Sequence, residues 1–491
     1  MRRRIILAVI LLAAMIAAVR LFTVARQFDT AVTAQIFDAL RDDHPALRAF
    51  LYRMPKGGDL HVHLSGAVYA EPLIEWAARQ GLCVRLADWF FVEAPCTPDK
   101  PAVAETMRDQ RKFDAMVNAM SMRFFLPSAA VPVGREQFFS TFARLSEITG
   151  RVTPEMTVDM LTRYGAQSVQ YAEFMVSFST REERAALIAS IRGQTDFATM
   201  LETLKQNGLD ALVAKARAEV TDIVGKVETL RNCDADPAQP ACRVTYRFIV
   251  QVSRNTPIED VFVQTAFAAA LVRAEPRIVA LNFVQTEDNQ IARRDYTRQM
   301  RIVEFLARDV QVALHAGELW LGLVPPTELT FHIRQAIEIG GARRIGHGTS
   351  TAFERDVDGL LAEMRRRRVV IEISLTSSDV ILGVRGNDHP LPTYLAAGVP
   401  VVLSTDDPGV SRIDFTNEYF RGAREHRLGY RTLKSLARNA LVYSFLTEPE
   451  KQQELRRFDR WSAEFEASIT SQQTWPQRLW MLILEAVAPT R

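Results

Sequence analysis

The chain has 491 residues, of which 48% are hydrophobic and 24% charged, and this balance allows a large apolar core. Its formal net charge is +2, so the composition gives no reason to expect a nucleic-acid partner. Tandem repeats, low-complexity tracts and Gly/Ser-rich linkers are absent from the sequence, so composition alone does not divide the chain into modules.

The N-terminus has the pattern of an export signal. Three arginines at positions 2–4 precede an unbroken apolar run over residues 5–19, shorter than the roughly 20 residues of a membrane-spanning helix. We expect residues 1–25 to be a cleaved signal peptide or a retained signal anchor, with residues 5–19 as the membrane tether in the second case. A buried amphipathic helix is the alternative, but the run has neither helical nor strand periodicity. The expected location is therefore periplasmic or extracellular, either soluble or anchored.

Cysteine usage agrees with an oxidising location. The four cysteines form two close pairs, and we expect disulfides Cys83–Cys96 and Cys233–Cys242. The sequence also allows two other connectivities, and free buried cysteines are a further alternative. A zinc ribbon is not favoured, because no C-x-x-C pair is present.

After a helical arm at residues 30–54, short apolar strands alternate with helices. Alternation of this kind produces a parallel sheet, and eight such units fit a closed (β/α)8 TIM barrel over residues 55–491. Helical insertions are expected at 103–166 and 181–230, and closing helices after about residue 448. The strand candidates are Asp59–His63, Ser168–Glu173, Thr245–Gln251, Ile278–Phe283, Val310–His315, Arg343–Gly346, Val369–Ser374 and Val399–Ser404.

Charged and imidazole side chains gather at the C-terminal ends of these strands, the face on which barrel active sites lie. The first strand ends in His61 and His63, which point the same way because they are two residues apart. The fifth, sixth and eighth strands end near five further candidates: His315 with Glu318, His347, and the Asp406–Asp407 pair. Neutral imidazoles suit zinc, and buried paired carboxylates repel without a cation or a proton. Each element alone also has an ordinary structural explanation as a core histidine, a helix cap or a turn.

Taken together, the motifs resemble the adenosine-deaminase family of the amidohydrolase superfamily. The matching segments are Met54–Leu64, Tyr171–Phe174, Leu314–Glu318, Arg344–Gly348 and Leu403–Pro408. The lead-in at 30–54, the export signal and the segment Asn387–Pro390 are most similar to the secreted branch that includes adenosine-deaminase-related growth factors.

The resemblance implies one Zn²⁺ per chain, held by His61, His63, His315 and Asp406. The ion would lower the pKa of a water molecule, which His347 would orient toward the ring carbon that bears the amine. Glu318 would protonate a ring nitrogen, Asp406 would also accept a proton, and ammonia would leave. Asp407 would contact a second ring nitrogen, and Gly317 would lie at the substrate. The third and fourth strands end near Gln251 and Gln285 without a lysine to bridge two metals, which favours a single ion.

Two positions depart from the family pattern, and both concern the substrate. Ser65 stands where the family usually has an aspartate that contacts ribose, and Gln285 stands where it usually has a glycine beside the purine. The leading hypothesis is deamination of adenosine or a related purine nucleoside. The alternatives are a zinc deaminase for another aminated heterocycle and an exported nucleoside-binding protein without turnover.

Overall fold

The computed structural model describes residues 27–128 and 133–473. The predicted export signal at residues 1–25, with its tether at 5–19, lies outside these residues. Within the described ranges, no helix combines the length and apolar character needed to cross a membrane.

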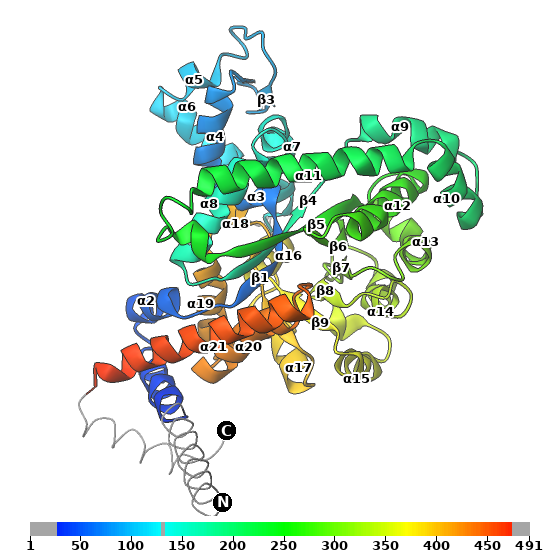
Figure 1. Ribbon diagram of the computed structural model, residues 1–491. Coiled ribbons are helices and arrows are strands. Elements are labelled where there is room, and N and C mark those ends of the chain that lie inside the picture. The colour runs from blue at the N-terminus through cyan, green and yellow to red at the C-terminus, as the bar shows by residue number, and fades with distance from the viewer. Residues whose placement is uncertain (1–26, 129–132, 474–491) are drawn as a thin grey trace, which may run out of the picture.

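In the described part of the chain, eight parallel strands form the central sheet, in the order β1-β4-β5-β6-β7-β8-β9-β10 (Figure 1). Main-chain hydrogen bonds from His63 N to Asp406 O and from Asp406 N to His61 O, each 2.9 Å, join the last strand to the first and close the barrel. The (β/α)8 prediction is therefore confirmed. The strands are β1 (Gly58–His63), β4 (Tyr171–Val176), β5 (Thr245–Ser253), β6 (Ile278–Val284), β7 (Val312–Ala316), β8 (Arg344–His347), β9 (Val370–Ile373) and β10 (Val401–Leu403).

Most of the strands are buried at every residue, so both of their faces are covered. Strands covered on both sides read as continuous apolar runs, which is why they were recognisable in the sequence. The predicted start of β4 is wrong by three residues. Ser168 has φ +60°, so it belongs to the turn that ends the preceding helix and cannot begin a strand.

Two long insertions separate β1, β4 and β5, as the sequence indicated. The first contains a small antiparallel hairpin and six helices, and in Figure 1 part of it projects above the barrel. Its elements are α3 (Leu64–Ala67), α4 (Ala70–Arg79), β2 (Cys83–Val84), β3 (Phe91–Val92), α5 (Val103–Thr106), α6 (Gln110–Ala119), α7 (Arg135–Thr149) and α8 (Thr153–Ala166). The second insertion contains α9 (Arg181–Ser190), α10 (Phe197–Gln206) and α11 (Leu209–Arg231).

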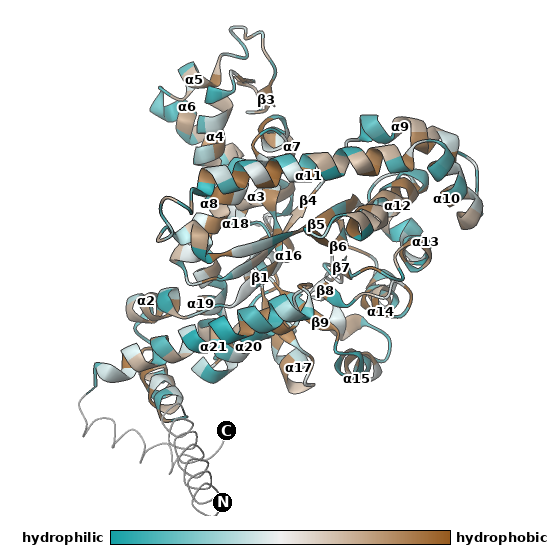
Figure 2. Ribbon diagram, viewed as in Figure 1, coloured by the Kyte–Doolittle hydropathy of each residue, from teal (hydrophilic) through white to brown (hydrophobic). Residues whose placement is uncertain are grey.

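Amphipathic helices cover the outside of the barrel, and Figure 2 shows hydrophilic residues along outer helices such as α15 and α21. The crossover helices are α12 (Ile258–Ala274), α13 (Gln290–Leu306), α14 (His332–Glu338), α15 (Val357–Arg367), α16 (Leu375–Leu382) and α17 (Leu391–Ala396). The closing helices are α18 (Pro408–Ser411), α19 (Phe415–Glu425), α20 (Tyr430–Val442) and α21 (Glu448–Ser471).

The N-terminal arm packs against the closing helices. Residues 27–39 are helical, and α2 (His44–Arg53) follows. Phe37 is fully buried, and its ring lies 6.3 Å from that of Tyr430 on α20. Thr30 Oγ1 donates to Glu466 on α21 at 3.0 Å, and Thr470 Oγ1 donates to Asp29 at 2.9 Å. The arm therefore belongs to the same packed body as the barrel.

All four cysteines lie in the described residues and form the two expected disulfides. Cys83 pairs with Cys96 beside the β2–β3 hairpin, with Cα atoms 5.5 Å apart. Cys233 pairs with Cys242 in the loop after α11, with Cα atoms 5.7 Å apart. Each bond closes a short loop within an insertion.

Candidate metal and active site

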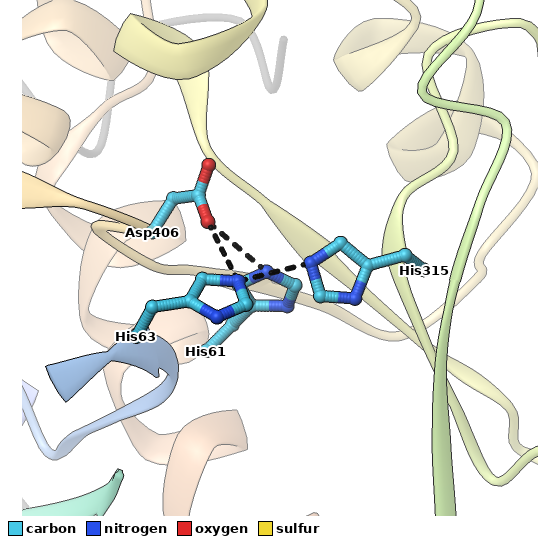
Figure 3. Close-up of side chains that lie close together, drawn as sticks. All are labelled: His61, His63, His315 and Asp406. Carbon is cyan, nitrogen blue, oxygen red and sulfur yellow. Dashed lines mark hydrogen bonds and ion pairs between the residues drawn. The ribbon is translucent and has the colours of Figure 1, made fainter. Parts of the chain in front are cut away.

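Strand ends bring the four predicted metal ligands together at the C-terminal face of the barrel (Figure 3). His61 and His63 come from β1, His315 comes from β7, and Asp406 follows β10. All four side chains are buried, and one ligand atom from each lies within 4.8 Å of all the others.

The distances show which atoms face the centre of the cluster. His63 Nε2 lies 3.1 Å from His315 Nε2, and Asp406 Oδ1 lies 3.3 Å from His63 Nε2 and 3.4 Å from His61 Nε2. Three Nε2 atoms and one carboxylate oxygen therefore point into the same small volume. Such a set, three histidines with one carboxylate, is a donor combination suited to a divalent transition metal.

A second layer of acceptors fixes the orientation of each imidazole. Nδ1 of His61 lies 2.8 Å from Glu372, Nδ1 of His315 lies 2.9 Å from Asn282, and Nδ1 of His63 lies 3.3 Å from Gln251. Because these partners offer oxygen acceptors, each ring is set to carry its proton on Nδ1 and to present an Nε2 lone pair inward.

The contacts within the cluster favour a bound cation. Converging lone pairs on His63 and His315, 3.1 Å apart, repel each other without a cation, and buried His61 Nε2 has no hydrogen-bond partner among the described residues. The second carboxylate oxygen of Asp406, Oδ2, has its hydrogen-bond partner outside the cluster, because Ser377 Oγ donates to it at 2.5 Å. The residues of the cluster therefore fit a metal ion.

Two candidate residues adopt unusual backbone conformations at their strand ends. His347 has φ +68° and Asp406 has φ +62°, in the left-handed region that side chains other than glycine rarely occupy. Gln285, another predicted site residue, has φ +76°. Strained conformations of this kind cluster at functional sites, because the surrounding structure has to hold them in place.

Glu318 and His347 lie beside the metal cluster and differ in their protonation. Glu318 Oε1 lies 3.8 Å from His347 Nε2. Burial raises the pKa of Glu318 well above its usual range, and the charges of Asp406 and Glu287 raise it further. Burial lowers the pKa of His347 to about 4, so its imidazole is neutral near pH 7. Burial thus favours the uncharged form of both side chains.

Asp407 is also buried, and its burial together with the charge of neighbouring Asp406 raises the pKa of its carboxyl well above the usual range. Its Oδ1 has no hydrogen-bond partner within the described ranges. The side chain lines the same cavity as Glu318 and can therefore meet a bound ligand.

A cavity of about 430 Å³ opens beside the cluster and receives most of the predicted substrate residues. Ser65, Gln285 and Asp407 line it together with Glu318 and His347. Gly317 does not line it. Its φ is +77°, and an added Cβ would lie 2.8 Å from the side chain of Ile333, so this glycine is needed for the turn before Glu318.

Several functional neighbours were missed by the sequence reasoning. Glu287 accepts hydrogen bonds from the main-chain N–H groups of Gly317 (3.1 Å) and Glu318 (2.8 Å) and lies 2.6 Å from Nδ1 of buried His332. Burial by itself raises the pKa of Glu287, but the charges of His332 and Arg254 bring it below the usual range. This carboxylate therefore anchors the turn that presents Glu318.

Two of the missed residues had a sequence signal in common. Glu372 and Asn282 are polar residues inside otherwise apolar strands, β9 and β6. A buried polar side chain needs a partner, so each position pointed to an unseen contact. Ser377, on α16, gave no such signal.

Fold and cluster together define a class: a (β/α)8 barrel with a buried metal site at the C-terminal ends of its strands. Residues 156–461 match the sequence model of the family described as adenosine deaminase. The chain belongs to the adenosine deaminase family.

Curated relatives match over part of their length. The chain is 40% identical to aminodeoxyfutalosine deaminase of Streptomyces coelicolor over 128 residues, which are 26% of this chain and 32% of that protein. It is 36% identical to adenosine deaminase of Salmonella schwarzengrund over 148 residues, which are 30% of this chain and 41% of that protein. The match therefore spans only about a third to two fifths of these relatives.

Solved structures match over almost their whole length. Adenine deaminase from Arthrobacter aurescens aligns with a TM-score of 0.53 at 17% identity, over 83% of this chain and 99% of that one. Arabidopsis ADAL, solved as a complex with GMP, aligns with a TM-score of 0.55 at 19% identity, over 85% and 99%. At this identity the likeness shows a shared fold.

Proposed function

We propose that this protein is a zinc-dependent deaminase that removes the amino group of adenosine or a related purine nucleoside and releases ammonia. The observation that best supports this proposal is that the Nε2 atoms of His61, His63 and His315 and Asp406 Oδ1 converge on one point. This point lies beside buried Glu318, on the wall of one cavity. Membership of the adenosine deaminase family supports the reaction class, a hydrolysis of C–N bonds in cyclic amidines.

His61, His63, His315 and Asp406 would hold one zinc ion. Zinc bound there supplies Lewis acidity, which lowers the pKa of water toward neutrality. The donor set supports zinc over Mg²⁺ or Ca²⁺, because those ions prefer oxygen ligands alone.

The remaining side chains supply proton transfer and orientation. Glu318, whose protonated form is favoured by burial, can donate its proton to a ring nitrogen as the amine-bearing carbon is attacked. Neutral His347, 3.8 Å from Glu318, can orient the attacking water, and Asp406 can accept a proton through its carboxylate. Asp407, whose pKa is also raised, can donate a hydrogen bond to a second ring nitrogen.

Deamination of another aminated heterocycle is the second candidate. Ser65 and Gln285 line the cavity at positions that depart from the family pattern, so the residues that select the substrate differ while the proposed metal and proton groups are complete. Similar proteins include an aminodeoxyfutalosine deaminase, an adenosine deaminase and an adenine deaminase. A binding protein without turnover is disfavoured, because no ligand or acid position has been lost.

We also propose export to the periplasm or the extracellular space, with the N-terminal segment as signal or anchor. The two disulfides support this location, since such bonds persist in oxidising compartments. Protease treatment of intact cells, or of cells whose outer membrane alone is permeable, tests it. Degradation of the protein is expected, and full protection until cell lysis would contradict export.

The test of function uses the full-length chain. Bound zinc is measured by elemental analysis, and ammonia release is followed with adenosine, deoxyadenosine, adenine, AMP, guanosine and guanine. We expect one zinc per chain and release from at least one purine. His63→Ala should lose both, while His44→Ala, at an exposed histidine, should keep both. If the protein binds one zinc per chain but releases ammonia from no purine, the deaminase proposal is wrong and the metal site is still supported.

A further inference from the structure

We infer that the preferred substrate is an uncharged purine nucleoside with an apolar group at the end remote from the reacting amine, and not a 5′-nucleotide. This inference rests on the proposed function and concerns the outer half of the same cavity.

The outer wall of the cavity is apolar. Phe138, Phe139 and Phe142 of α7 line it with Ile381 of α16. These helices lie outside the strands, and α7 belongs to the insertion between β1 and β4, whereas Glu318 and Asp406 follow strand ends at the cavity floor. A purine whose amine-bearing carbon reaches the floor therefore directs its far end toward the phenylalanines.

The three rings form one cluster with an open side. The ring of Phe138 lies 5.2 Å from that of Phe139 and 5.9 Å from that of Phe142. Phe138 is buried, but Phe139 and Phe142 are only partly buried and keep ring surface for a ligand. Covering such surface with a methyl or thioether group is favourable, because it removes apolar area from water.

Nothing in this wall suits a phosphate. In the described part of the chain, the cavity lining contains no lysine or arginine, and its titratable groups are the carboxyls of Glu318, Asp406 and Asp407 and the imidazoles. Arg135, at the start of α7, is paired with Asp288 at 2.6 Å. Arg254 donates to main-chain carbonyls of Phe283 and His315 beneath the cavity. A phosphate would lose its hydration here without a cationic partner.

Apart from Val284, the lining residues at or after the ends of β4, β5 and β6 are neutral and polar, as a nucleoside requires. They are Ser177, Gln251, Ser253, Asn255, Gln285 and Thr286. Asn255 Nδ2 donates to Thr286 Oγ1 at 2.9 Å, and its buried Oδ1 has no partner among the described residues. Because Asn255 lines the cavity and its amide oxygen has no partner among the described residues, it is the candidate to accept a hydrogen bond from a sugar hydroxyl, which a free base lacks.

The test compares kcat/KM of the full-length, zinc-loaded protein for adenosine, 5′-deoxy-5′-methylthioadenosine, AMP and adenine. We expect the methylthio nucleoside to exceed adenosine by about 10-fold, the range given by an added apolar group in an apolar pocket, and AMP to fall at least about 100-fold below adenosine. Asn255→Ala should raise KM for adenosine more than KM for adenine.

Variants of the apolar wall separate recognition from folding. Phe142→Ala should reduce the preference for the methylthio group over adenosine by about 10-fold, and Phe142→Leu should restore most of it. Phe305→Ala, a half-exposed phenylalanine on α13 outside the cavity, is the matched control and should change neither rate. Zinc content of each variant confirms that the site is intact.

The outcomes distinguish the two proposals. AMP turned over as well as adenosine, or a preference for the methylthio group that Phe142→Ala leaves unchanged, would overturn this inference and leave the deaminase function intact. Absence of ammonia from all four compounds and from deoxyadenosine, guanosine and guanine would instead defeat the proposed function, and this inference with it.

Discussion

Nδ1 of His61 on β1 lies 2.8 Å from Oε2 of Glu372 on β9, although 311 residues separate them in the chain. Both side chains are fully buried. Glu372 also pairs with Arg344 at 2.7 Å, and Arg344 pairs with Glu173 at 2.5 Å. This network, drawn from four strands, holds the imidazole with its Nε2 directed at the cluster.

Replacing Glu372 with glutamine should weaken zinc binding by roughly 10- to 100-fold, because a neutral amide is a poorer partner for the Nδ1 proton of His61. Competition with a chelator of known affinity measures the change. Glu464→Gln, at an exposed position on α21, is the control. A zinc affinity unchanged in Glu372→Gln would show that this contact does not tune the site.

Glu318→Gln should lower kcat by about 10²- to 10⁴-fold, since glutamine keeps the size of the side chain but cannot transfer a proton. Zinc content should stay at one per chain, because Glu318 is not among the four clustered ligands. Glu182→Gln, exposed on α9, serves as the matched control. Wild-type turnover in Glu318→Gln on the best substrate would disprove the assigned proton donor.

Stability should depend on pH through Glu418, which accepts hydrogen bonds from the main-chain N–H groups of Leu375 (2.6 Å) and Thr376 (3.3 Å) at the start of α16. Burial raises the pKa of Glu418 to about 7. The folded protein therefore binds more protons than the unfolded chain between about pH 4.5 and 7. The contribution of Glu418 to the free energy of unfolding is present at low pH. It falls by about 3 kcal/mol as the pH rises through this window.

Glu418→Gln isolates this effect, because glutamine keeps an acceptor for the helix N–H groups and does not titrate. Urea unfolding of both proteins at pH 5 and pH 8 gives the free energies of unfolding. The wild type should lose stability relative to the variant at the higher pH. If the difference in the free energy of unfolding between the two proteins stays constant with pH, the titration of Glu418 does not contribute to stability.

Replacing both Cys233 and Cys242 with serine should lower the free energy of unfolding by about 2–3 kcal/mol, because the short loop after α11 is no longer closed in the unfolded chain. Denaturant unfolding under non-reducing conditions measures it, with the wild type as reference. Zinc content should not change, since this loop lies within an insertion and supplies none of the clustered ligands. An unchanged unfolding midpoint would show that the Cys233–Cys242 disulfide does not stabilise the protein.

The sequence by itself determined the eight strands, because strands buried on both faces are apolar at nearly every residue and are bounded by polar ends. It also determined that His61, His63, His315 and Asp406 would meet, because the C-terminal ends of parallel barrel strands converge on one face. The disulfide partners were near neighbours in the chain, so loop closure favoured the pairing that the structure contains.

Tertiary structure alone decided what surrounds those ligands. Whether Glu372 faces His61, or Ser377 faces Asp406, depends on the register of strands and on helix placement, which no local pattern specifies. The steric need for glycine at position 317, where an added Cβ would meet the side chain of Ile333, was likewise invisible in the sequence. The phenylalanine wall, too, required α7 to fold back over the cavity from an insertion whose direction periodicity does not encode.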